Sequence, residues 1–229
     1  MARRPVFSVS QGGYPLFDCE EIGFPYFNGF STAQKQRCIR SLHQAYLEKH
    51  PQAKLLEISS QSETGLGVRL SAFHLTRTLQ SGKCVPVEVA FQAGKRFEHG
   101  GAYADLLDVP PGKAKNDGRL KNSGDIIGFT CDGVGFAAEP KTFFYNWLYI
   151  TALQEHRGLL EGLLEYDAFT DIAFNPQKSL NCQAEAAAIC VSLHRRGQLQ
   201  AALASPQSFL DAVYRPQTEE APRQLAFEL

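Results

Sequence analysis

Residues 85–97, VPVEVAFQAGKRF, bring a carboxylate, an amide and an amine into one short segment. On a helix each residue advances by about 100°, so Gln92 would lie about 40° to one side of Glu88 and Lys95 about 20° to the other. The two charged groups would be about 10.5 Å apart along the axis, too far for an i,i+4 ion pair. They could instead flank one small ligand and supply general acid–base or nucleophilic groups. The alternative is the solvated face of an amphipathic helix.

A second segment, residues 110–121, is locally basic. It holds four cationic side chains and one acidic one: Lys113, Lys115, Arg119, Lys121 and Asp117. A start rich in Gly and Pro beside basic side chains suits a phosphate or a diphosphate. The pattern of a P-loop is absent. The alternative is an ordinary basic surface turn.

Two further segments are polar. Residues 166–183 interleave Asp171, Asn175 and Asn181 with aromatic side chains, and a connection of this length inside a domain is usually functional or disordered. The alternative is a packed connection with Asx turns. Residues 57–63, EISSQSE, could hydrogen-bond a ribose, but a polar turn after a strand is the preferred interpretation.

The elements that must position these residues are mostly helical. Apolar periodicity and capping residues predict helices at 31–49, 86–97, 140–154, 158–165, 182–194 and 205–214. A short helix that starts at Asp108–Pro111 should carry residues 113–119, and Asn181 or Ser179 should cap the helix at 182. Strands are predicted at 54–59 and 68–75, and loops or a hairpin at 122–135. The fold class is therefore helix-rich α+β, in one compact domain.

The ends of the chain differ from its middle. Residues 1–29 are rich in Gly, Pro and aromatic residues and predict an irregular segment packed against the core. Together with the first helix they form an N-terminal extension, residues 1–52. Residues 215–229 should be a mobile tail.

Composition excludes several classes of protein. The chain has 229 residues, 44% hydrophobic and 21% charged, which is typical of a globular domain. A net charge of −1 excludes a protein that holds nucleic acid or an anionic membrane by bulk charge. No export signal or membrane-spanning run is visible, so a cytoplasmic protein without membrane contact is expected. The six cysteines form no C-x-x-C pair and no zinc pattern, so neither a metal nor a cofactor is predicted.

These segments resemble a known family. The resemblance to the NADAR (YbiA-like) family rests on Val85-Pro86-Val87-Glu88 with Phe91-Gln92-Ala93-Gly94-Lys95, on Ala114-Lys115-Asn116-Asp117-Gly118-Arg119, and on Leu70-Ser71-Ala72-Phe73. EISSQSE, LGVRLSAF, EPKTFFYNWLYI and FTDIAFNPQKSLNCQA are similar to the NADAR antitoxins encoded beside DarT-type toxins. Three positions depart from the family pattern: Val89 replaces a frequent His, Ala72 an Asn, and Ala173-Phe174 a Trp-Gly pair.

The resemblance implies a NADAR-like catalytic domain at 53–214. The family comprises N-glycosidases acting on ADP-ribose-type compounds, and the antitoxins remove the ADP-ribose that DarT-type toxins attach to guanine in DNA. It implies ADP-ribosylated DNA as substrate, ADP-ribose as product and a co-encoded toxin as partner. Two other readings stay open: a non-catalytic protein that binds ADP-ribose or sequesters the toxin, and an N-glycosidase acting on a small ribosyl metabolite.

The resemblance also implies residue roles. Glu88 would shuttle a proton or activate water. Lys95 would form a Schiff base with ring-opened ribose or stabilise the sugar cation. Asp171 would bind ribose or assist acid–base chemistry. The predicted ADP-ribose-binding residues, among which Arg119 with Lys115 would hold the diphosphate, are Ser71, Phe73, Gln92, Lys115, Gly118, Arg119, Asn175 and Asn181.

Overall fold

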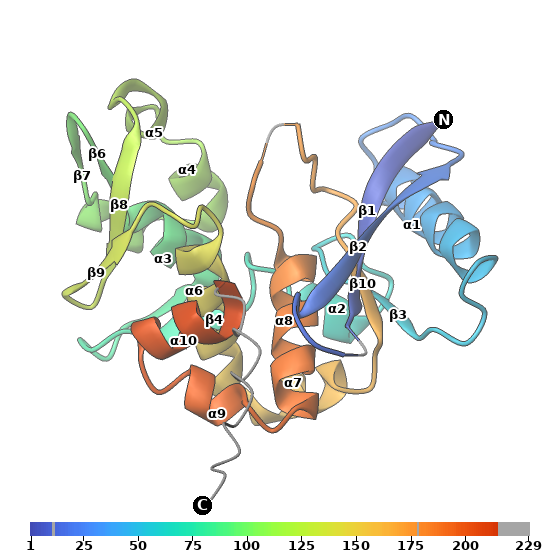
Figure 1. Ribbon diagram of the computed structural model, residues 1–229. Coiled ribbons are helices and arrows are strands. Elements are labelled where there is room, and N and C mark those ends of the chain that lie inside the picture. Colours follow the sequence, from blue (N-terminus) through green and yellow to red (C-terminus); the bar gives the residue numbers. More distant parts are fainter. Residues whose placement is uncertain (11, 178, 215–229) are drawn as a thin grey trace, which may run out of the picture.

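Figure 1 shows the arrangement of the helices and strands in a computed structural model, which describes residues 1–10, 12–177 and 179–214. The predicted tail, 215–229, lies outside the described residues. Helices and three small sheets form one α+β domain, which confirms the predicted fold class. The N-terminal strands lie on one side of the molecule and the hairpin of β8 (Ile126–Cys131) and β9 (Val134–Ala137) on the other, with α6 (Phe143–Gln154) and α8 (Gln183–Arg195) between them.

The largest departure from the sequence analysis is at the N-terminus, where strands replace the predicted irregular segment. A four-stranded sheet has the order β2-β1-β10-β3. Its strands are β1 (Ala2–Val9), β2 (Phe17–Phe24), β3 (Leu55–Glu57) and β10 (Ala168–Thr170). Pro5 is tolerated because the part of β1 around it pairs only with β2. The sheet includes strands from both sides of residue 52, and the division of domains there stays a prediction.

Helices cover this sheet. The predicted helix at 31–49 is confirmed as α1 (Thr32–Leu47), and the Ser31 side chain accepts a hydrogen bond from the Gln34 amide as its N-cap. Its buried residues, Cys38, Ile39, Leu42 and Tyr46, form one apolar cluster with β1, β2 and β10. Helix α8 (Gln183–Arg195) contacts β1 and β10 as well. Both helices therefore fix the position of β10 and of the loop that follows it.

The other half of the molecule is built on a sheet with the order β7-β6-β8-β9. Its strands are β6 (Lys95–Phe97), β7 (Gly100–Gly101), β8 (Ile126–Cys131) and β9 (Val134–Ala137), and a separate pair comprises β4 (Thr76–Thr78) and β5 (Cys84–Pro86). The hairpin predicted within 122–135 is confirmed by β8 and β9, joined at Asp132-Gly133. Stacked rings of Phe91, Phe129 and Phe144 hold this sheet against the helices.

The remaining helices surround the core. They are α2 (Gly65–Arg69), α3 (Val87–Ala93), the 3-10 helix η1 (Ala104–Asp108), α4 (Pro111–Lys115), α5 (Arg119–Asn122), α6 (Phe143–Gln154), α7 (Arg157–Leu163), α9 (Leu199–Ala202) and α10 (Pro206–Tyr214). The predicted helices at 140–154, 158–165, 182–194 and 205–214 are confirmed by α6, α7, α8 and α10. Helix α6 is buried on nearly every side and lies at the centre of the apolar core.

The strand predicted at 68–75 is wrong, whereas that at 54–59 is confirmed by β3. Residues 65–69 form α2 instead, because Thr64 caps the segment by accepting a hydrogen bond from the Gly67 amide at 3.1 Å. Gly67 lies against the backbone of Glu57, where a Cβ atom would stand 2.0 Å from the carbonyl oxygen. Local capping and this close approach override the alternating pattern.

The helix predicted at 86–97 ends early, at Ala93. Gly94 forms its C-cap, and the Gly94 carbonyl accepts a hydrogen bond from the Thr130 amide at 2.8 Å. A Cβ atom on Gly94 would lie 2.4 Å from the Thr130 carbonyl, so only glycine lets β8 approach this closely. Lys95 therefore begins β6 rather than lying on the last helical turn.

Three smaller predictions are also wrong. Residues 113–119 divide between α4 and α5, and Asp108 pairs with Lys83 instead of capping α4. The polar segment at 166–183, expected to be a connection without strands, contains β10. The N-cap position of α8 is Cys182, whose side chain makes no capping bond, rather than Asn181 or Ser179. Each of these boundaries is decided by contacts with distant segments.

Candidate active site

Glu88 is a buried carboxylate in the first turn of α3, only 6% exposed. Gln92, one turn later, donates from Nε2 to Glu88 Oε1 at 2.8 Å, as the helical spacing predicts. The Nζ of Lys115 on α4 lies 3.7 Å from the same oxygen. No hydrogen bond to Oε2 of Glu88 occurs among the described residues. The structure thus brings two predicted site residues, Gln92 and Lys115, against the carboxylate of a third, Glu88.

Lys95 extends from the start of β6, and its Nζ lies 4.8 Å from the centroid of the Phe91 ring. Burial lowers the pKa of Lys95 to about 8; the Glu88 charge opposes this shift, and the Lys115 charge adds to it. A substantial fraction of the amine is therefore neutral just above neutral pH. A neutral amine can act as a nucleophile.

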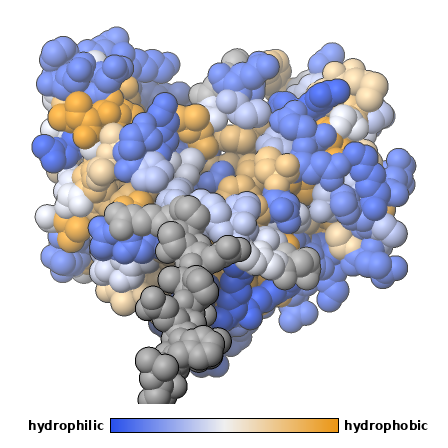
Figure 2. All heavy atoms as spheres, viewed as in Figure 1, coloured by the Kyte–Doolittle hydropathy of each residue, from blue (hydrophilic) through white to orange (hydrophobic). Residues whose placement is uncertain are grey.

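Lys95 lines a cleft of about 540 Å³. One wall comes from α3, β6 and β8, and the other includes Leu180 and Asn181 from the loop before α8. Figure 2 shows a notch in the outline of the molecule between these two parts. The charged residues that share the cleft with Lys95 are Asp125, Glu139 and Lys141. The cleft is thus electrostatically mixed rather than strongly basic.

Asp171 directly follows β10, and its carboxylate accepts hydrogen bonds from backbone amides of the loop that it begins. Its Oδ1 accepts hydrogen bonds from the amides of Ala173 and Phe174, and its Oδ2 accepts one from Gln183 at 3.0 Å. Burial and the neighbouring Glu57 charge raise the pKa of Asp171 to about 7. This carboxyl group can therefore hold or release a proton near neutral pH.

Tyr145 on α6 lies within the range of both carboxylate charges. Burial raises the pKa of its phenol well above the usual value, and the charges of Glu88 and Asp171 act in the same direction. Its ring packs edge-on against Phe91, with the centroids 5.1 Å apart. Because both charges act on one phenol, Glu88 and Asp171 belong to one region of the molecule.

Comparison with families of known proteins supplies the decisive observation. Residues 2–223 match the model of the DarT1-associated NADAR antitoxins. The chain belongs to this family. Membership assigns this NADAR antitoxin a role in a DarT system, with a DarT-type toxin as partner, and NADAR proteins are generally N-glycosidase-like hydrolases. A comparison with curated proteins gave no match.

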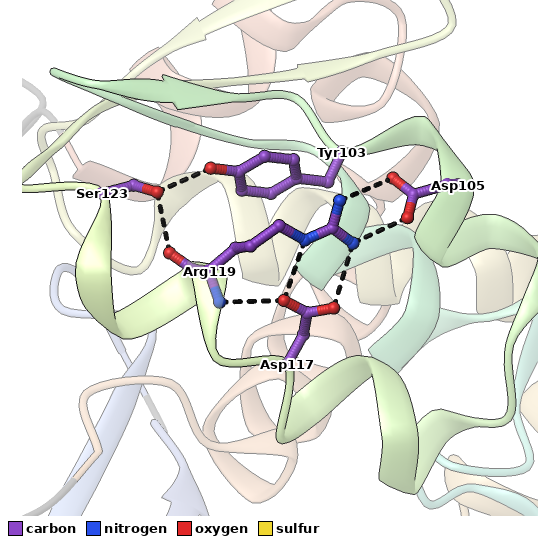
Figure 3. A network of polar contacts seen from close by, with 5 residues as sticks. All are labelled: Tyr103, Asp105, Asp117, Arg119 and Ser123. Carbon is purple, nitrogen blue, oxygen red and sulfur yellow. Dashed lines mark hydrogen bonds and ion pairs between the residues drawn. The ribbon is translucent and has the colours of Figure 1, made fainter.

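Within the NADAR antitoxin, the predicted diphosphate ligand Arg119 is already paired (Figure 3). Its guanidinium donates twice to Asp105 and twice to Asp117, which uses four of its five N–H donors. It also stacks on Tyr103, 4.4 Å from the ring centroid. A ligand would have to compete with two carboxylates, so the role of Arg119 in binding ADP-ribose stays a prediction.

The other predicted ligand residues of the NADAR antitoxin occupy different surroundings. Ser71 is buried and bonds His74 Nδ1 at 2.8 Å, and the ring of Phe73 lies 5.3 Å from Lys115 Nζ. Gly118 is the N-cap residue of α5. Asn175 accepts a bond from the Gln177 amide within its loop, whereas Asn181 lines the cleft.

Two buried acceptor atoms of the site have no hydrogen-bond partner among the described residues: Gln92 Oε1 and Asn181 Oδ1. An unpaired buried acceptor is costly, so each is suited to a donor on a bound ligand. These atoms support the predicted binding role of both side chains without identifying the ligand.

Three residues of the NADAR antitoxin site were not predicted from the sequence: Glu57, Gln183 and Tyr145. Glu57 belongs to a segment for which a polar turn was the preferred interpretation, although its position within the strand predicted at 54–59 was a usable signal. Gln183 stands out as a polar residue on the buried face of α8. Nothing in the sequence marks Tyr145 as a site residue, because it lies in a run of aromatic residues that is typical of an apolar core.

Among the described residues, no group of three or more His, Cys, Asp or Glu side chains is placed to hold a metal ion. None of the described helices has the length and apolar character needed to span a membrane.

Proposed function

We propose that this NADAR antitoxin is an ADP-ribosyl glycohydrolase that removes ADP-ribose from guanine bases of DNA in the cytoplasm. The proposal rests on family membership and on one observation, the Lys95 amine of lowered pKa at the cleft, on which the charge of the buried Glu88 carboxylate acts. Cleavage of an N-glycosidic bond develops positive charge on the anomeric carbon. A buried carboxylate stabilises such a charge more strongly than one in water does.

Glu88 has a defined part in the proposed reaction. When the C1′–N bond breaks, its electron pair goes to the guanine nitrogen, and the carboxylate of Glu88 faces the positive sugar. Its unpaired Oε2 then accepts the proton of the attacking water. Gln92 and Lys115 hold the other oxygen, so the carboxylate keeps one orientation.

Lys95 acts by one of two routes. As a neutral amine it would attack C1′ and form a Schiff base with the ring-opened ribose, which water then hydrolyses. As an ammonium ion it would stabilise charge on the leaving base. Its position at the cleft and its pKa near 8 support either route.

Recognition should depend on the modification rather than on DNA as a polymer. The cleft balances Lys95 and Lys141 with Asp125 and Glu139, and the whole chain carries a net charge of −1. Few phosphate contacts are therefore expected, and unmodified DNA should bind weakly. Guanine offers N–H donors, which the free acceptors of Gln92 and Asn181 could receive. An accessible or unstacked nucleotide fits this requirement.

The direct test is incubation with a DNA oligonucleotide that carries ADP-ribosylated guanine. Wild-type protein should release free ADP-ribose, detected by mass, and restore unmodified guanine. Release from a small ribosyl compound alone would favour the metabolite N-glycosidase. Tight binding of ADP-ribose, with no ADP-ribose released from the modified DNA, would favour a non-catalytic protein that binds ADP-ribose or sequesters the toxin.

A further inference from the structure

Phe30 is an aromatic side chain that stands fully exposed on the surface. It lies in the loop between β2 and α1, residues 25–31, which also carries the half-buried rings of Tyr26 and Phe27. The proposed reaction, which takes place at Lys95, makes no use of this ring. A single exposed ring is common on protein surfaces, so its surroundings decide what it can do.

The loop that carries Phe30 is anchored to α1. The Phe27 amide donates to Cys38 Sγ at 3.2 Å, and the Cys38 thiol donates to the Phe27 carbonyl at 3.4 Å. Gly29 has a φ of 138°, which favours glycine, and a Cβ atom there would lie 3.0 Å from Gln34 Cγ. The backbone just before Phe30 is therefore held closely against the helix, while the Phe30 ring points into solvent.

Two cations lie beside these rings. Lys35 Nζ donates to Tyr26 Oη at 3.1 Å, and the guanidinium of Arg37 lies 4.0 Å from the centroid of the Phe27 ring. Neither cation forms an ion pair with a carboxylate in the described part of the chain. Both charges are therefore available to an anionic partner.

Positive charge is concentrated in this part of the sequence. Residues 22–47 contain three cationic residues and no Asp or Glu, namely Lys35, Arg37 and Arg40. Arg40 pairs with Glu63, and the exposed Arg3 on β1 lies opposite Gly23 near the end of β2. The chain as a whole has a net charge of −1, so this surface is positive by local composition rather than by the overall balance.

The loop lies at the end of the sheet from which one wall of the cleft is built. Strand β1 is antiparallel to both β2 and β10, so β2 and β10 run in the same direction and end at the same end of the sheet. The loop after β2 carries Phe30, and the segment after β10 leads to Asn181 in the cleft wall. Ile172 of that segment belongs to the apolar cluster against which Tyr26 and Phe27 pack. Figure 1 shows both loops at the top of the molecule.

We propose that Phe27, Phe30, Lys35 and Arg37, here called the N-terminal patch, bind the single-stranded DNA that flanks the modified guanine. The inference rests on the proposed function, which places that guanine in the cleft. A flanking base stacks on the Phe30 ring, and the phosphates beside it contact Lys35 and Arg37. An exposed ring with neighbouring cations is the combination by which proteins hold single strands without reading their sequence.

A single strand fits the N-terminal patch better than a duplex does. Stacking on a side chain needs a base that is free of its neighbours, whereas the bases of a duplex cover one another. The modified guanine stays attached to its strand, so the strand must leave the cleft across its rim, to which the segment after β10 contributes. With only two unpaired cations, the patch adds few phosphate contacts, in keeping with the weak binding expected for unmodified DNA.

Fluorescence polarisation with an unmodified single-stranded oligonucleotide tests the N-terminal patch directly. At low salt, Phe30→Ala should weaken binding roughly 5- to 100-fold, the loss of one base stacked on an aromatic side chain. Phe30→Trp keeps a ring and should retain the affinity. Ile127→Ala changes another exposed apolar residue, outside the lining of the cleft, and should bind like the wild type.

The salt dependence of binding tests the cations. The logarithm of the binding constant falls with the logarithm of the salt concentration, with a slope of about −0.7 for each phosphate contact on a single strand. Arg37→Gln should therefore make the slope shallower by about 0.7. Arg157→Gln removes an exposed cation on α7 and should leave the slope unchanged.

Kinetics connect the N-terminal patch to the cleft. For the wild-type protein, kcat/KM for ADP-ribose release should be higher with a modified single-stranded oligonucleotide than with a single ADP-ribosylated guanine nucleotide, because only the longer substrate reaches the patch. Phe30→Ala should bring the ratio of these two values toward one, through a higher KM for the oligonucleotide.

The outcomes that contradict the inference differ from those that contradict the proposed function. Unchanged DNA affinity in Phe30→Ala and an unchanged salt slope in Arg37→Gln would overturn it. Loss of binding to the purified DarT-type toxin in these variants, with DNA binding intact, would overturn it too and assign the patch to the toxin. A wild-type protein that binds single strands through Phe30 but releases no ADP-ribose would remove the proposed function and leave the DNA-binding surface standing.

Discussion

The ammonium group of Lys115 lies 3.7 Å from Oε1 of Glu88, the oxygen that also accepts the hydrogen bond of Gln92. This contact joins α4 to α3 and leaves Oε2 of Glu88 without a partner in the described part of the chain. The basic segment that the sequence analysis assigned to a diphosphate therefore reaches the carboxylate assigned to catalysis. One ligand could contact both.

Glu88→Gln should reduce ADP-ribose release at least 10²-fold, because the amide can neither accept the proton of water nor stabilise a cation. The fold should persist, since glutamine matches the shape and still accepts the bond from Gln92. Release from modified DNA and a thermal melt measure the two effects. Glu161→Gln, on the exposed face of α7, is the matched control. Full activity in Glu88→Gln would remove this residue from the mechanism.

The pH dependence of the rate of ADP-ribose release should reflect the titration of Lys95. A plot of this rate against pH should bend near pH 8 for the wild-type protein. Lys115→Met should move this bend to higher pH, because the Lys115 cation lowers the pKa of Lys95 and its removal lets that pKa rise. An unchanged bend would show that Lys95 does not titrate in the measured reaction.

Trapping distinguishes the two routes for Lys95. If a Schiff base forms, borohydride added during turnover should leave the sugar attached to Lys95, and a mass spectrum of the digested protein would locate it. Lys95→Ala should abolish both turnover and trapping, whereas Lys54→Ala, at an exposed site, should change neither. Turnover by wild type without any trapped adduct would favour the electrostatic route.

Arg119→Ala should weaken ADP-ribose binding while leaving turnover of bound substrate unchanged, if the guanidinium reaches the diphosphate. Asp105→Asn gives the sharper comparison, because it releases one of the two competing carboxylates and should tighten binding. Calorimetry with ADP-ribose measures both variants. Equal affinity in all three proteins would make the network of Figure 3 purely structural.

Gly67→Ala should destabilise the protein by about 1–3 kcal/mol, the usual cost of overpacking a filled site. The added methyl group would meet the Glu57 carbonyl and Ser62 Oγ at 2.0 and 2.3 Å. Gly112→Ala in α4 is the control, since nothing lies within 4 Å of its new Cβ. Chemical denaturation gives both values, and equal stabilities would contradict the packing described for α2.

Protection of cells should require the active site. Co-expression with the DarT-type toxin should restore growth for the wild-type protein and fail for Lys95→Ala, with the guanine modification in DNA measured in parallel. Rescue by Lys95→Ala while the DNA stays modified would show that the antitoxin sequesters the toxin instead of reversing its product.

Local signals in the sequence were sufficient for several features. The Ser31 cap and the apolar stripe of α1 act within a few residues, and so does the i,i+4 contact between Glu88 and Gln92. The hairpin at Asp132-Gly133 is likewise encoded by its own turn. The family resemblance carried by residues 85–95 and 114–119 also survives, because it depends on residue types in order along the chain.

Tertiary contacts decided the rest. Lys95 lies outside the helix because β8 packs against Gly94. Arg119 on α5 pairs with Asp105 because η1 lies against α5 in the folded chain. Glu57 and Asp171 became neighbours only when β3 and β10 paired in parallel. Local spacing determines which side chains share a helix face. The burial and neighbouring charges that set acidity arise only when distant segments exclude water around them.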